Sequence, residues 1–147
     1  MVIVGLGIFG FGHHLANNLE SIFMARFDSM PSATASQIIR AGVKATGLEE
    51  FLRQAASEVK TPIAVDSVTT LVALNATKDS LEYHYTVDTE LTSFRDGFLE
   101  DVKVRHCQWK TLQPIVDAGA KIRVIYRSTK DVILGDISID KEQCSRM

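Results

Sequence analysis

The sequence predicts an α+β domain in which a four-stranded antiparallel sheet carries helices on one face, preceded by an apolar N-terminal helix. The hydrophobic spacing changes along the chain from the helical period of 3.6 residues to the strand period of 2 and back. The strand-like segments come as two pairs with helical segments between them, which is typical of α+β domains. The chain has 147 residues, 46% of them hydrophobic, which suits a single globular domain with a sizeable core.

The N-terminal run differs in composition from the rest of the chain. Residues 1–19 contain no Asp, Glu, Lys or Arg. We therefore divide the chain into a hydrophobic anchor or docking helix in residues 1–30 and an α+β domain in residues 31–147. Pro31 and Ser32 mark the boundary, because proline and serine commonly end one element and cap the next helix.

A membrane anchor is the first interpretation of the apolar run. A spanning helix needs about 20 predominantly apolar residues, and this run reaches that length only by including polar residues such as His13 and Asn17. Closely spaced small residues let a second helix approach in lipid, so the anchor is expected to pack against other membrane-protein subunits. The residues that would form this packing surface are Gly5, Gly7, Gly10 and Gly12.

Two other interpretations of the run stay open. Residues 2–10 also read as a strand followed by the G-x-G-x-x-G fingerprint, with Asp28 near the position of a ribose-binding acid. This alternative is a soluble, cytoplasmic dinucleotide-binding protein, but no regular β-α alternation follows the fingerprint. A secretory signal peptide is the third interpretation, and it lacks a charged region at its start.

Two helices are expected at the start of the domain. The first follows Ser32 and ends at Gly47, with apolar residues at helical spacing. The second covers residues 48–59, where the apolar residues form one stripe and the charged residues fall opposite. Such stripes predict helices that bury one face against the sheet.

The first strand pair is a hairpin of residues 68–74 and 81–87 around a polar turn. In the second strand apolar residues alternate with Glu82, His84 and Thr86, which predicts a sheet with one face exposed to solvent.

Helical spacing then returns through Phe94, Phe98 and Val102, and a short helix that includes residues 112–116 precedes Gly119, a residue suited to a left-handed cap. A second hairpin closes the domain, with strands at residues 120–127 and 132–139. The order of the strands in the sheet stays open.

The two cysteines, Cys107 and Cys144, allow two interpretations. In an oxidising compartment an even pair in a small domain predicts a disulfide, whereas in the cytosol the two would be unrelated thiols. The histidines and cysteines lack the paired spacing of a zinc site, so no metal is expected.

The sequence predicts no active site, cofactor or nucleic-acid surface. His106 and Cys107 are adjacent on a helix and point about 100° apart, so the imidazole is poorly placed to activate the thiol. The chain has 16 Lys and Arg against 18 Asp and Glu, which leaves no basic excess for phosphates. Trp109 either completes the core or offers a contact to a partner.

Residues 60–145 resemble a group of small exported or membrane-anchored bacterial proteins of unassigned function. Their motifs run D-x-x-T-x-L, a Y-x-Y strand, a helix ending in Cys, a glycine before a strand with Tyr, and a final Cys. The corresponding residues here are Asp66, Thr69, Leu71, Tyr83, Tyr85, Cys107, Gly119, Tyr126 and Cys144. The resemblance implies an extracytoplasmic location and a bridge between the two cysteines, and it implies no activity.

Together these observations predict a non-enzymatic binding protein, an accessory subunit or partner of a membrane protein complex. The expected location is the bacterial inner membrane, with the α+β domain in the periplasm.

Overall fold

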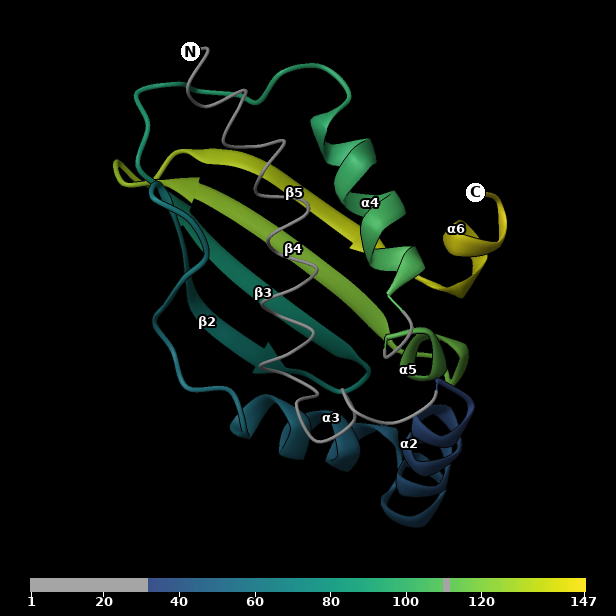
Figure 1. Ribbon diagram of the computed structural model, residues 1–147. Helices are drawn as coiled ribbons and strands as arrows, with labels where there is room; N and C mark the ends of the chain where they lie inside the picture. The colour runs from purple at the N-terminus through teal and green to yellow at the C-terminus, as the bar shows by residue number, and fades with distance from the viewer. Residues whose placement is uncertain (1–31, 110–111) are drawn as a thin grey trace.

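The computed structural model describes residues 32–109 and 112–147 as an α+β domain with a single mixed sheet (Figure 1). The expected N-terminal helix and its glycines lie outside these residues. The elements in chain order are α2 (Ser32–Thr46), α3 (Leu48–Ser57), β1 (Ile63–Ala64), β2 (Thr69–Ala76), β3 (Ser80–Val87), α4 (Phe98–Gln108), α5 (Gln113–Asp117), β4 (Lys121–Ser128), β5 (Ile133–Ile139) and α6 (Lys141–Ser145).

The sheet has five strands in the order β1-β2-β3-β4-β5, in which β3 and β4 are parallel and the other neighbours antiparallel. The expectation of four antiparallel strands was therefore wrong in two respects. The two hairpins form as expected, but α4 and α5 carry the chain from the end of β3 back to the start of β4, so that these strands run the same way. β1 has only two residues, too few for a period in the sequence to reveal it.

A side-chain bond sets the turn that precedes β2. Asp66 Oδ1 accepts hydrogen bonds from the backbone N–H groups of Val68 and Thr69, each at 2.8 Å. Aspartate commonly holds a turn in this way. The D-x-x-T pattern noted in the sequence thus has a folding role here.

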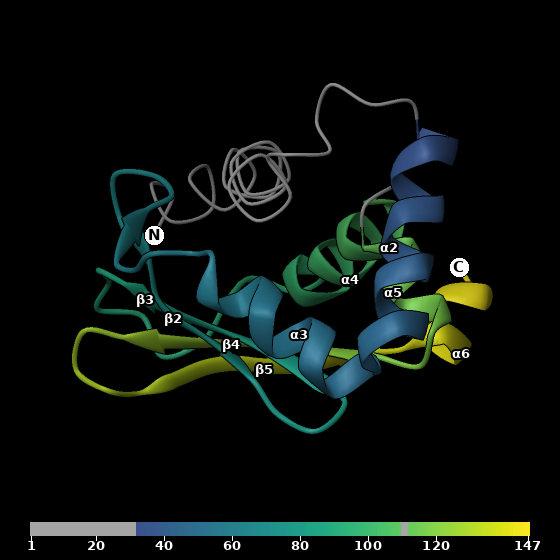
Figure 2. The same cartoon turned by 90° about the horizontal axis from the view of Figure 1, so that it is seen from below.

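The helices gather on one side of the sheet, as Figure 2 shows with the sheet nearly edge-on. The alternation expected in residues 81–87 is confirmed, because the inward side chains of β3 are buried while Glu82, His84 and Thr86 are only partly buried on the other face. The core beneath the helices is rich in aromatic rings. Tyr85 stacks on Tyr126 with ring centroids 5.0 Å apart. Such stacked pairs stabilise a core beyond the area they bury.

The helix expected around Phe94 and Phe98 begins at Phe98. Phe94 lies in the segment before α4 and still reaches the core. Its ring centroid is 4.3 Å from that of Phe98 and 5.1 Å from that of Tyr126. Gly97, which has a φ of 84°, separates the segment from the helix. Glycine adopts this left-handed conformation at little cost.

Gly135 lets α4 approach the sheet closely. A Cβ atom at this position would lie 2.7 Å from Cδ2 of Leu99, a residue of α4 that is itself packed against the core. We expect Gly135→Ala to lower the free energy of unfolding by about 1 kcal/mol, because the end of the Leu99 side chain must shift to make room for the added methyl group.

Urea denaturation of a double-mutant cycle tests this prediction. In a Leu99→Ala background the overlap is absent, so the cost of Gly135→Ala should fall to near zero. Purely additive effects of the two substitutions would contradict it.

Candidate functional site

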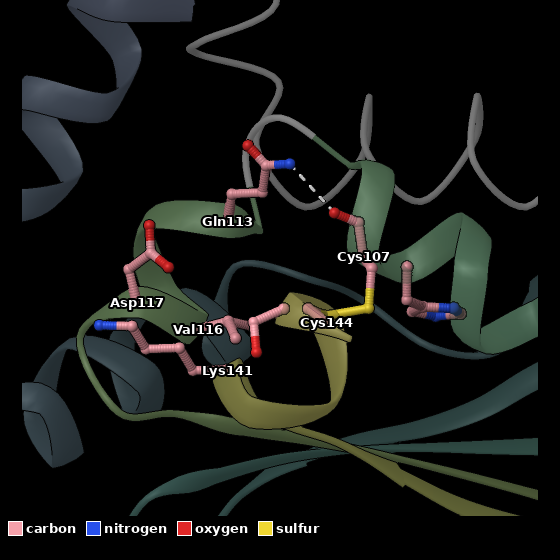
Figure 3. A pocket seen from close by; sticks show the side chains of 8 residues that line it. Cys107, Gln113, Val116, Asp117, Lys141 and Cys144 are labelled. Atoms are coloured by element: carbon pink, nitrogen blue, oxygen red, sulfur yellow. Dashed lines mark hydrogen bonds between the residues drawn. A yellow bond between two sulfur atoms is a disulfide. The ribbon is translucent and has the colours of Figure 1, made fainter. Parts of the chain in front are cut away.

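A pocket of about 250 Å³ lies where α4, α5 and α6 meet (Figure 3). α4 and α5 follow one another closely in the sequence, whereas α6 comes after β4 and β5, and the fold brings all three together at one end of the sheet (Figure 1). The residues that line the pocket are His106, Cys107, Gln113, Val116, Asp117, Lys141, Cys144 and Ser145.

A disulfide forms one wall of the pocket. Cys107, near the end of α4, is bonded to Cys144 in α6 with an S–S distance of 2.01 Å and Cα atoms 5.4 Å apart. Asp140 caps α6 by accepting a hydrogen bond from the backbone N–H of Gln143 at 2.8 Å. Because α6 contains no buried residue, the disulfide is its main connection to the rest of the domain.

His106 forms the inner wall of the pocket and is only 2% exposed. Burial lowers its pKa to about 4, so the ring is neutral at pH 7. Its Nδ1 lies 2.8 Å from the carbonyl oxygen of Val102 and must carry the hydrogen that this carbonyl accepts. Nε2 is therefore an acceptor, and it finds no hydrogen-bond partner within the described part of the chain.

Two aromatic rings enclose His106. The ring of Trp109 lies 4.4 Å from it and that of Tyr83 lies 6.1 Å from it, measured between centroids. Trp109 is 4% exposed, so the structure places this side chain in the core and not on the surface that a partner would meet first. Its role is to cover the histidine.

His106 was not expected to be a site residue, although the sequence carries a signal of its burial. Phe98, Val102 and His106 follow one another at intervals of four residues and form the buried face of α4. Residues four apart lie on one face of a helix. The histidine thus continues the apolar stripe, which predicts its burial.

The rim of the pocket is polar. Gln113 donates a hydrogen bond from Nε2 to the carbonyl oxygen of Cys107 at 3.0 Å and so joins α5 to α4. Asp117 and Lys141 lie together on the side of the pocket away from the disulfide (Figure 3). The pocket therefore combines an apolar wall with two opposite charges at its edge.

The opposite face of the sheet carries an ion-pair network. Arg123 donates to both carboxylate oxygens of Asp136, at 2.7 and 3.0 Å, and lies 3.6 Å from Glu82. These hydrogen bonds lower the pKa of Asp136. His84 lies 3.3 Å from Glu82 in the same network. The network joins β3, β4 and β5 and shows no arrangement of a nucleophile with a base.

Within the described ranges, 32–109 and 112–147, no three His, Cys, Asp or Glu side chains are grouped to hold a metal ion. In those ranges no helix has the length and apolar character needed to cross a membrane. The packing surface expected from Gly5, Gly7, Gly10 and Gly12 lies outside them.

No protein-family model matches the chain, and no curated protein sequence matches it. Solved structures do resemble it. A predicted secreted protein from Pseudomonas aeruginosa is 18% identical with a TM-score of 0.58, over 66% of this chain and 92% of that one. The type II secretion system pilotin AspS from Vibrio cholerae is 19% identical with a TM-score of 0.56, over 69% of this chain and 99% of that one.

The pilotin EpsS from the type 2 secretion system of Vibrio vulnificus is also 19% identical, with a TM-score of 0.60 over 70% of this chain and 96% of that one. These chains share a fold with this one. The likeness extends over almost the whole of each pilotin and about two thirds of this chain.

Removal of the disulfide should weaken the fold. We expect the double variant C107A/C144A to lose about 2–4 kcal/mol of unfolding free energy, because the bridge restricts the unfolded chain. Reduction of the wild-type protein should have the same effect and should leave the variant unchanged. Chemical denaturation measures the loss. Equal stability of oxidised wild type and variant would contradict this role.

The stability of the protein should also depend on His106. The unfolded chain binds a proton at this residue below pH 6.5, whereas the folded chain does so only near pH 4. The contribution of neutral His106 to the free energy of unfolding is therefore complete above pH 6.5. It is lost as the pH falls towards 4, which lowers the free energy of unfolding by on the order of 3 kcal/mol.

Urea unfolding at several pH values between 7 and 4 measures this effect. His106→Phe keeps a ring in place and should remove the His106 contribution to the pH dependence, whereas His84→Gln on the far face of the sheet should retain it. A pH dependence that persists in full in His106→Phe would exclude the assignment.

Proposed function

We propose that this protein is a non-enzymatic accessory protein of the bacterial envelope, and that its α+β domain binds a protein subunit of a membrane-associated secretion complex. The observation that carries the proposal is the likeness of its fold to two pilotins of type II secretion systems, over 96–99% of their length.

The disulfide supports a location outside the cytoplasm. Disulfides persist in oxidising compartments such as the periplasm and are rare in the bacterial cytosol. Cys107 and Cys144 form one here. The fold likeness to a predicted secreted protein supports the same location, as does the resemblance to exported bacterial proteins noted from the sequence. We place the domain in the periplasm.

The N-terminal run is the proposed attachment to the membrane. Residues 1–19 lack charged side chains of the Asp, Glu, Lys and Arg types. In this proposal they anchor the protein in the inner membrane, with Gly5, Gly7, Gly10 and Gly12 packed against another subunit.

Purification of the tagged full-length protein from its native membranes in mild detergent tests this function. We expect a partner in fixed stoichiometry, identified by mass spectrometry as a subunit of a secretion complex, and its loss when residues 1–20 are deleted. In the same preparation, alkylation before reduction should leave both cysteines unlabelled.

Other outcomes would contradict the proposal. Two freely alkylated thiols would place the domain in the cytoplasm. A soluble protein that purifies alone would exclude the membrane role and favour the alternative of a dinucleotide-binding protein that uses Gly5, Gly7, Gly10 and Asp28.

A further inference from the structure

The pocket beside the disulfide has a wall that depends on that disulfide. α6 supplies three of the lining residues, Lys141, Cys144 and Ser145, yet has no buried residue of its own. Cys144 is the member of α6 that packs against the core. Without the bridge to α4, little buried surface would hold this short helix in place, and the wall would be lost.

The size and the apolar part of the pocket suit one aliphatic side chain. Its volume of about 250 Å³ exceeds the roughly 150 Å³ of cavities that hold a benzene molecule. The apolar surface comes from the disulfide and from Val116, which also lines the pocket (Figure 3). A linear or branched alkyl group would gain contact with both.

The polar part of the pocket suits a peptide group. Lys141 is a donor and Asp117 an acceptor, and neither forms an ion pair with a described residue within 4.0 Å. A peptide group offers a carbonyl oxygen to a cation and an N–H to an acceptor, whereas a simple anion would use only the lysine.

We propose that this pocket binds one aliphatic side chain of a partner polypeptide together with the adjoining peptide group, and that the site exists only while the Cys107–Cys144 disulfide is closed. The inference rests on the proposed function, because it names the part of the protein partner that is recognised. It adds the chemistry of the contact and its dependence on an oxidising compartment.

Titration of the oxidised full-length protein with N-acetyl-leucinamide, followed by the NMR signals of backbone amides, tests the site. We expect saturable shifts confined to α5, α6 and the last turn of α4. N-acetylglycinamide, which lacks only the side chain, should bind at least about tenfold more weakly, because an aliphatic group that leaves water gains more than that factor. Shifts that sodium acetate reproduces in full would reveal an anion site and overturn the proposal.

Two substitutions on α6 provide a matched pair. Ser145→Phe places a ring at the pocket and should abolish the shifts, whereas Glu142→Phe introduces the same ring on a residue that does not line the pocket. Ser145 is exposed, so its replacement leaves the core intact. Equal binding by the two variants would overturn the assignment of the site.

The double variant C107A/C144A tests the dependence on the disulfide. Its sheet residues should keep their dispersed amide signals, while the probe should no longer cause shifts in α5. Binding equal to that of the oxidised protein would overturn this dependence.

The experiments distinguish failure of the proposed function from failure of the proposed pocket ligand. If a secretion subunit co-purifies but N-acetyl-leucinamide causes no saturable shift, the proposed function stands and the pocket assignment is wrong. If the probe binds and no subunit co-purifies, the function is wrong and the partner polypeptide named here is wrong with it.

Discussion

The parallel pairing of β3 with β4 is the constraint on which the rest of this structure depends. Parallel neighbours cannot be joined by a tight turn, so the chain must travel back along the sheet between them. α4 and α5 make that return on one face (Figure 1). The return brings the end of α4 to the end of the sheet where β5 finishes and α6 begins. Cys107 and Cys144 therefore meet because of the topology, and their bond stabilises a proximity that the crossover has already created.

The sequence predicts the parts of the fold that depend on local patterns. Alternation in residues 81–87 identifies which side chains of β3 are buried, and the apolar stripe of residues 48–59 identifies the helix that becomes α3. The parallel pairing of β3 with β4 could not be predicted from such patterns. Each hairpin is marked by its own turn residues, whereas the pairing between the two hairpins involves residues far apart in the chain. β1 and α6 are too short for a period to appear, and α6 depends on a cap at Asp140 and a covalent bond.

In the candidate site, too, features that depend on local sequence could be predicted, and features that depend on contacts between distant segments could not. Residue type left the cysteine pair open between a disulfide and two free thiols, and only the resemblance to exported proteins implied the bridge. The pocket beside it requires three segments whose relative placement only the fold determines. His106 could have been recognised as buried from its position on the stripe of α4, but not as an unsatisfied acceptor, because that depends on what surrounds Nε2. Trp109 illustrates the reverse case, since a residue type common at interfaces serves here to cover a histidine.

The disulfide also determines how the domain would carry mechanical load. The bridge spans a sequence separation of 37 residues, and α5, β4 and β5 all lie inside the loop that it closes. Tension applied between the chain before Cys107 and the chain after Cys144 passes through the sulfur atoms, so this loop cannot be extended while the bond is intact. Such a pull would therefore load the strands that precede Cys107 and leave the chain between the two cysteines without tension.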